Sequence, residues 1–157
     1  MNTLFTTNYE SPVGILKISS NQDALTGISF SLQREENTSN HPILEKTKEQ
    51  LDAYFAGERF VFTIPLQVVG TPFQVSVWNA LQTISYGQMV SYQDIAIAIG
   101  NPRAVRAVGM ANNRNPISII IPCHRVIGKT GSLVGYAGGL ETKQWLLSHE
   151  SDFQRRI

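Results

Sequence analysis

The chain contains a single cysteine, Cys123, which follows an apolar run and a proline. The run is Ile117–Ile121, and the cysteine is followed directly by His124 and Arg125. With no second cysteine, neither an intrachain disulfide nor a cysteine-based metal site can form. The 157 residues must therefore fold through their apolar side chains, which make up 42% of the chain, as in an ordinary globular protein.

Two interpretations of the thiol are open. Free cysteine is among the most often buried residue types, which favours an inert thiol. The neighbouring His124 and Arg125 favour a nucleophile, because positive charge beside a thiol lowers its pKa. Adjacent side chains point in different directions, so we expect His124 to act on the sulfur through a water, with a carboxylate fixing its tautomer. Among the few acids of the second half, Glu150 is the candidate for that carboxylate.

Charge is unevenly divided along the chain. Residues 1–100 hold 5 Lys or Arg and 9 Asp or Glu, whereas residues 101–157 hold 8 and 3, although the net charge is only +1. A basic half indicates an anionic partner such as nucleic acid. The competing interpretation is chance segregation of charges on solvated faces.

Residues 1–68 are predicted to form an α+β domain. Apolar alternation between turn-like segments predicts strands, followed by a helix over 42–56 that begins at His41 and stops at Gly57. The expected strands are 4–9, 15–19, 25–30 and 60–64. His41 is expected to be a surface or capping residue, and no catalytic constellation is found in this half.

Residues 69–157 are predicted to form a mainly helical domain. Its first helix begins with three agreeing signals, since Thr71 can cap, Pro72 suits the first helical position and Gln74 completes a capping box. The apolar residues of this helix recur as far as Ile84, and the helix is expected to end at Tyr86-Gly87.

The next two helices form a helix-turn-helix candidate. One begins with the capping signal Ser91–Asp94 and stops at Gly100, and the other runs from Asn101 to about Ala111. The second carries Arg103 and Arg106 among small side chains, which would let it approach a phosphate backbone closely. A solvated helix face with two ordinary arginines is the competing interpretation.

Three segments complete the chain. Ile117–Ile121 is predicted to be either a buried strand or a segment that passes through the core. Five glycines between 128 and 139 predict a loop with sharp bends or close approaches. A final helix is expected over 140–150.

These segments resemble the O6-alkylguanine-DNA alkyltransferases. The likeness covers nearly the whole of 71–150 in order and spacing, and it is looser over the first 65 residues. The motifs that carry it are Thr71-Pro72-Phe73-Gln74, Val90-Ser91-Tyr92, Asn101–Gly109, Asn115-Pro116, Pro122-Cys123-His124-Arg125-Val126, Gly135–Gly139 and Lys143 to Glu150. The family's fold class is α+β, with a small ribonuclease-H-like unit before a mainly helical domain that contains a helix-turn-helix.

The resemblance implies direct-reversal DNA repair. Alkylated guanine, and also O4-alkylthymine, would be flipped out of double-stranded DNA bound through the minor groove, and its alkyl group would pass irreversibly to Cys123. The resemblance implies His124 as a base acting through a water, oriented by Glu150. It implies Tyr92 as a donor to the leaving guanine and Asn115 as support for the cysteine turn.

DNA-contacting and pocket residues follow from the same resemblance. Arg106 would fill the space that the flipped base vacates. The DNA-contacting set is Arg103, Ala104, Arg106, Arg125 and Tyr92, and the base pocket is lined by Val126, Tyr136, Ala137 and Gly138. Arg114 would either contact phosphate or be solvated.

Other expectations concern cofactors, partners and location. No cofactor is implied, and a chain with one cysteine is expected to lack the zinc site of some relatives. No apolar stretch suits a membrane span or a secretory signal, so a cytoplasmic location is expected. The protein is also expected to be a monomer. Two other functions stay open, a helix-turn-helix DNA-binding module with a structural cysteine and a cysteine hydrolase that uses Cys123 and His124.

Overall fold

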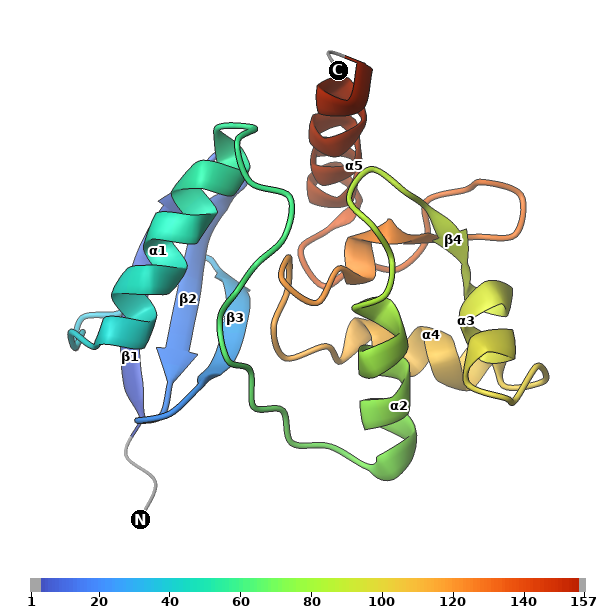
Figure 1. Cartoon of the computed structure of the whole chain (residues 1–157), viewed down its shortest axis with the longest axis horizontal. Helices are drawn as coiled ribbons and strands as arrows, with labels where there is room; N and C mark the ends of the chain where they lie inside the picture. The colour runs from blue at the N-terminus through green and yellow to red at the C-terminus, as the bar shows by residue number, and fades with distance from the viewer. Residues whose placement is uncertain (1–3, 156–157) are drawn as a thin grey trace. The chain divides into compact units, whose positions relative to one another are not determined.

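The structure is a computed structural model that describes residues 4–155 (Figure 1). The chain divides into two compact units, one ending at Val68 and one beginning at Val69. The N-terminal unit combines one sheet with one helix in its described residues, and the C-terminal unit is mainly helical. None of the helices in the described part of the chain is long and apolar enough to cross a membrane.

The N-terminal unit is an antiparallel sheet covered by a helix. Strands β1 (Phe5–Ser11), β2 (Gly14–Ser20) and β3 (Leu25–Ser31) pair in the order β1-β2-β3, and α1 (Pro42–Phe55) lies across them (Figure 1). Alternate residues of β2 are buried beneath apolar residues of α1, as period-two and helical patterns predict. The side chain of His41 accepts a hydrogen bond from the backbone N–H of Ile43 and caps α1, as the sequence indicated.

The strand predicted over 60–64 is wrong. The backbone N–H of Thr63 donates to the side-chain carbonyl of Gln50 at 2.9 Å, which removes it from any sheet ladder. The chain meets the sheet only after Pro65, at an isolated parallel bridge between Leu25 and Leu66. The aromatic and β-branched residues of 60–64 predicted a strand. The side chain of Gln50 in α1 supplies the hydrogen-bond partner of the Thr63 backbone instead.

The C-terminal unit combines a cluster of three helices with a short parallel strand pair. The helices are α2 (Pro72–Leu81), α3 (Tyr92–Ala98) and α4 (Val105–Asn113), and they pack on one another. Strand β4 (Val90–Ser91) pairs with β5 (Val126–Ile127), which follows the single 3-10 turn η1 (Cys123–Arg125). The last helix, α5 (Leu140–Arg155), packs against η1.

Helix α2 begins as predicted and ends earlier than predicted. Thr71 and Gln74 form the reciprocal capping box, with hydrogen bonds of 3.1 and 3.0 Å. After Leu81 the chain changes to turns, in which the N–H and the hydroxyl of Thr83 both donate to the carbonyl of Ala80, at 3.1 and 2.7 Å. The positive φ of Gly87, 79°, belongs to the turn that leads into β4.

The helix-turn-helix pair differs from the prediction in its second member. Helix α3 begins at a second capping box, between Ser91 and Asp94. Helix α4 begins at Val105 rather than at Asn101, so Arg103 precedes the helix. Before that point the chain is held in a turn, because Gln93 donates to the carbonyl of Pro102 at 2.9 Å. The two arginines therefore do not share one helix.

Candidate active site

Cys123 lies at the end of a strained and buried segment. Ile117–Ile121 does not form a strand but passes through the core, folded back so that the N–H of Ile121 donates to the carbonyl of Ile117 at 3.0 Å. Ile119 has a φ of 75°, which β-branched residues rarely adopt. The sulfur that follows is buried, with the residue only 3% exposed.

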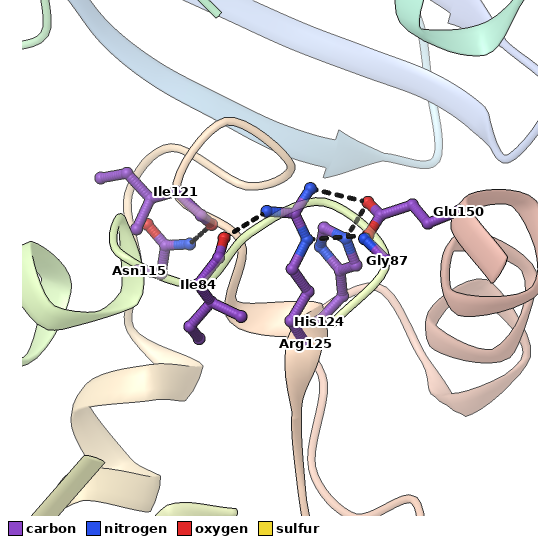
Figure 2. Close-up of polar contacts among 7 residues, drawn as sticks. All are labelled: Ile84, Gly87, Asn115, Ile121, His124, Arg125 and Glu150. Carbon is purple, nitrogen blue, oxygen red and sulfur yellow. Dashed lines mark hydrogen bonds and ion pairs between the residues drawn. The ribbon is translucent and has the colours of Figure 1, made fainter. Parts of the chain in front are cut away.

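Asn115 holds both ends of this segment, and Figure 2 shows its bond to Ile121. Its amide nitrogen donates to the carbonyl of Ile121 at 2.7 Å, and its side-chain oxygen accepts from the N–H of Ile117 at 3.0 Å. These two bonds stabilise the strained turn and so fix the backbone that presents Cys123. The family resemblance had implied this supporting position for Asn115.

His124 and Glu150 form a buried pair (Figure 2). The ring Nε2 of His124 lies 2.6 Å from the Oε2 of Glu150. Burial alone would raise the pKa of Glu150, but attraction to His124 and the hydrogen bonds from His124 and Arg125 hold it well below its usual range. Burial lowers the pKa of His124 more than Glu150 raises it, so the imidazole is neutral.

A neutral imidazole that donates from Nε2 keeps Nδ1 as an acceptor. The Nδ1 of His124 is buried and has no hydrogen-bond partner among the described residues. No direct hydrogen bond between this ring and the sulfur of Cys123 is present within residues 4–155. The arrangement provides a base whose free nitrogen can take a proton.

The prediction that Arg125 contacts DNA is wrong. The residue is only 6% exposed, and its guanidinium is fully engaged inside the protein (Figure 2). Nε and Nη2 donate to the carboxylate of Glu150 at 2.7 and 3.0 Å, and Nη1 donates to the carbonyl of Ile84 at 2.7 Å. A bidentate arginine of this kind fixes the carboxylate that in turn fixes His124.

The expected lowering of the thiol pKa by its sequence neighbours is also wrong. Burial raises the pKa of Cys123 to about 11, opposed by a hydrogen bond from Asn115 and by the charge of Lys143. His124 contributes no positive charge because it is neutral, and Arg125 is neutralised by Glu150. The free protein therefore holds its sulfur as a thiol at neutral pH.

Lys143 is a residue of the site to which the sequence analysis gave no role. It is fully buried, and its Nζ donates to the carbonyl of Val134 at 2.9 Å, 5.8 Å from the centre of the Tyr92 ring. Burial lowers the pKa of Lys143, and the neighbouring Cys123 raises it. Its spacing from Leu146 and Glu150 on α5 places it on the buried face, a signal that the sequence did contain.

Tyr92 lies at the first position of α3, where its hydroxyl donates to the same carbonyl of Val134 at 2.9 Å. Burial raises the pKa of Tyr92, and so does the nearby Cys123. The side chain is therefore a neutral phenol that can donate a hydrogen bond. Asn112, which the sequence analysis did not single out, donates to the carbonyl of Cys123 at 3.3 Å.

The predicted pocket residues are only partly brought together. Val126 is buried in β5, next to η1. Burial raises the pKa of Tyr136 well above its ordinary value, and the charge of Cys123 adds to this rise, so the two residues are close. Ala137 and Gly138 lie in the turn before α5, and neither is hydrogen-bonded to Cys123 in the described structure.

The outer face of α4 is basic and partly apolar. Arg106 and Met110, one turn apart, are exposed, whereas Val108, Ala111 and Asn112 are buried. Arg103, before the helix, and Arg114, at its end, are exposed as well. In the part of the chain that the structure describes, no three His, Cys, Asp or Glu side chains lie together in a way that could hold a metal ion.

Comparison with known proteins decides the family. The model of the 6-O-methylguanine DNA methyltransferase DNA-binding domain matches residues 72–152. The model of the ribonuclease-like domain of the same enzymes matches residues 4–68. The chain belongs to the 6-O-methylguanine DNA methyltransferase family. The predicted α+β fold class, with its small ribonuclease-like unit before a helical domain, is confirmed.

Individual relatives agree over almost the full chain. The chain is 48% identical to the constitutive methylated-DNA–protein-cysteine methyltransferase of Bacillus subtilis (strain 168), over 92% of this chain and 93% of that protein. It is also similar to the crystal structure of the Mycobacterium tuberculosis O6-methylguanine methyltransferase, with a TM-score of 0.88, 43% identity, and coverage of 96% and 94%. The Mycobacterium tuberculosis OGT in complex with DNA matches with a TM-score of 0.86, 44% identity, and coverage of 93% and 92%.

Proposed function

We propose that this protein repairs alkylated DNA directly, by moving the alkyl group to Cys123 in one irreversible turnover. The observation that carries the proposal is the buried thiol of Cys123. It follows a turn stabilised by Asn115 and directly precedes His124, a neutral histidine fixed by the carboxylate of Glu150. Relatives named as methylated-DNA–protein-cysteine methyltransferases support it. A helix-turn-helix protein with a merely structural cysteine would not need this costly set of buried charges.

The first step is removal of the thiol proton. We infer that Nδ1 of His124 accepts it through a water molecule, because that nitrogen is an unpaired acceptor and no direct bond to the sulfur is present in the described residues. Glu150 stabilises the imidazolium that forms, and Lys143 stabilises the thiolate. The absence of a direct hydrogen bond between this ring and the sulfur in the described residues argues against a hydrolase that uses the two as a directly bonded pair.

In the second step the thiolate attacks the alkyl carbon. A sulfur–carbon bond forms, the bond from that carbon to O6 of guanine breaks, and its electron pair stays with the base. Tyr92 donates a proton to the base as it leaves, which its neutral phenol allows, and the proton that His124 took from the thiol restores the phenol through water. The product is a thioether with no ready hydrolytic exit, so each molecule reacts once.

The base must first leave the duplex, because the alkyl carbon cannot be reached within the stack. We propose that α4 enters the minor groove and that Arg106 fills the vacated space, since it is exposed among small side chains. Arg103 and Ala104 then lie at the start of the helix, near the phosphates. Met110, one turn from Arg106, adds apolar surface to the same face.

The flipped base, alkylated guanine or O4-alkylthymine, is proposed to lie against Val126 and Tyr136. Backbone groups of Ala137 and Gly138 complete this pocket. The protein is proposed to act as a monomer without a cofactor. A chemistry that needs a reduced thiol favours a cytoplasmic location.

The proposal is tested by measuring the O6-methylguanine content of the DNA. A duplex containing one O6-methylguanine is mixed with a limiting amount of protein, and the bases are released and quantified over time. We expect O6-methylguanine to be converted to guanine until one equivalent of protein is used, and no conversion by Cys123→Ser. Conversion of several equivalents of O6-methylguanine per protein molecule, or no conversion by the protein with Cys123 intact, would refute the proposal.

A further inference from the structure

The buried carboxylate of Glu150 is shared by the proposed base and by an arginine (Figure 2). Its Oε2 lies 2.6 Å from Nε2 of His124 and also accepts from Nη2 of Arg125 at 3.0 Å. Its Oε1 accepts from Nε of Arg125 at 2.7 Å and from the backbone N–H of Gly87 at 3.3 Å. The guanidinium therefore binds both oxygens of the carboxylate, whereas the imidazole binds only one.

This sharing decides which partner carries the positive charge. A guanidinium stays protonated in a folded protein, so Arg125 supplies one full charge to the carboxylate. A second positive charge, on His124, would then be buried without a negative charge of its own. Burial lowers the pKa of His124, and the charge of Arg125 adds to this effect against the attraction of the carboxylate. The imidazole is therefore neutral in the free protein.

The other ionisable groups around this ring leave that balance in place. Lys143 on α5 is a second positive group, which acts on His124 in the same direction as Arg125 and more weakly. The nucleophile is a thiol in the free protein and adds no charge. Two tyrosines lie near the carboxylate, and burial raises the pKa of each, so both are neutral at pH 7: Tyr86, between α2 and β4, and Tyr136, before α5.

We propose that Arg125 is a positioning residue of the alkyl transfer, which neutralises Glu150 so that His124 stays uncharged and can accept the proton of Cys123. The role rests on the proposed alkyl transfer. The proton leaves the sulfur and reaches Nδ1 of His124 through water, so this nitrogen must be unprotonated beforehand. Without Arg125, the carboxylate would hold an imidazolium at neutral pH, and the base would be lost. Arg125 acts through Glu150 and does not itself touch the alkyl group.

The experiment measures the rate of single-turnover transfer from an excess of duplex containing O6-methylguanine, from about pH 5 to about pH 9. Arg125→Met removes the charge and keeps an unbranched side chain. We expect the pH at which the rate falls to half on the acid side to rise by about 1–2 pH units, because an unopposed carboxylate favours the imidazolium. Arg125→Lys keeps the charge, so this pH should lie within about 0.5 pH unit of that of the unmodified protein.

The matched control is Arg34→Met, which removes an arginine that pairs with the exposed Glu10 in the N-terminal unit. We expect the same half-maximal pH for this variant as for the unmodified protein. A rise of less than about 0.5 pH unit in Arg125→Met would overturn the role of Arg125. Equal rises in Arg125→Met and Arg125→Lys would also overturn it, because the effect would then not depend on charge.

A double variant keeps the proposal testable if Arg125→Met does not fold. Arg125→Met combined with Glu150→Gln replaces the buried ion pair with neutral groups, a change that folded proteins often tolerate. Since the net charge on the two residues is again zero, the half-maximal pH should stay within about 0.5 pH unit of that of the unmodified protein. A larger change in either direction would overturn the proposal. Failure of the unmodified protein to transfer the methyl group at any pH would instead refute the alkyl transfer itself.

Discussion

The two units treat buried polar groups in opposite ways. In the described part of the N-terminal unit, the buried polar side chains are neutral: Thr7, Ser20, Thr47 and Gln50. In the C-terminal unit they include four ionisable groups: His124, Arg125, Lys143 and Glu150. A buried charge destabilises the folded state unless it is fully paired. The C-terminal unit therefore contains groups that can destabilise it, and the described part of the N-terminal unit does not.

The strain is divided in the same way. The only non-glycine residue with positive φ in the described chain is Ile119, four residues before the sulfur. The unpaired acceptors of His124 and Asn112 lie in the same unit, whereas the described part of the N-terminal unit has one such buried atom, the hydroxyl oxygen of Ser20. The comparison indicates that the N-terminal unit is built for packing, whereas the C-terminal unit gives up some stability to hold a reactive arrangement.

The largest expected effect is the destabilisation of the C-terminal unit by Glu150→Gln. The change leaves Arg125 buried with a weakened partner and removes the charge that fixes His124, so we expect a loss of about 3–5 kcal/mol in the free energy of unfolding of the C-terminal unit. Both tryptophans of the chain, Trp78 and Trp145, lie in that unit, so denaturation followed by tryptophan fluorescence reports on it.

The matched control is Glu10→Gln in the other unit. Glu10 forms an exposed ion pair with Arg34 at 3.0 Å, and such pairs contribute little to stability. We expect a nearly unchanged denaturation midpoint for this variant. A similar midpoint for Glu150→Gln would show that its buried network contributes no more than a surface pair.

Tyr92→Phe should affect chemistry and leave packing nearly intact. The hydroxyl makes one hydrogen bond, to Val134, in a half-buried position. We expect alkyl transfer to slow about 100-fold, in the range of general acid catalysis, while affinity for undamaged duplex stays the same. Stopped reactions at increasing times measure the rate, and an unchanged rate would exclude donation by Tyr92.

Arg106→Ala should separate base extrusion from chemistry. Because Arg106 is exposed on α4 and takes no part in the hydrogen bonds of the buried network, we expect a loss of about 10-fold with methylated duplex and little loss with free O6-benzylguanine. Parallel rate measurements on the two substrates check this. Equal losses would mean that Arg106 does not act on the duplex.

The smallest expected effect is a difference between the two units in how much stability each loses at acidic pH. The pKa of His124 is lowered in the folded state, so the unfolded chain takes up a proton first as the pH falls below about 6.5. The lowered pKa of Glu150 acts in the same direction below about 4.5. Stability of the C-terminal unit is therefore present above pH 6.5 and lost on acidification, by at most about 1.4 kcal/mol per pH unit for each group.

Urea denaturation at pH 7.5 and 5.5, followed by tryptophan fluorescence, measures this loss. We expect a lower midpoint at pH 5.5. In the N-terminal unit, burial and Asp52 raise the pKa of Tyr9, which titrates only in alkali and gives no such acid response. A midpoint that rises or stays level at pH 5.5 would contradict the neutral, buried state of His124.

Local signals in the sequence predicted local structure well. The capping boxes at Thr71 and Ser91 fixed the starts of α2 and α3, because a cap depends only on residues three apart. The strand over 60–64 failed because the side chain of Gln50, distant in sequence, took its hydrogen bonds. Helix ends and strand pairing depend on such partners, which no local window contains.

The residues of the site also differ in whether the sequence alone could predict their roles. Cys123, with His124 beside it, was visible in the sequence, and Glu150 followed from the scarcity of acids. The fate of Arg125 was not visible, because a basic side chain next to the cysteine looks the same whether it faces a phosphate or a buried carboxylate. Lys143 was overlooked because a lysine on a helix is usually solvated, although its spacing from Leu146 and Glu150 indicated the buried face on which the fold places it.

The most direct test of the account is the mass of the peptide that contains Cys123. The full chain is incubated with a duplex carrying O6-methylguanine and, in parallel, with the same duplex unmodified, and then digested and analysed by tandem mass spectrometry. The account predicts one added methyl group on the sulfur of Cys123 with the damaged duplex and none with the other. An unmodified Cys123 after complete exposure to the damaged duplex, or a methyl group on another residue, would contradict it.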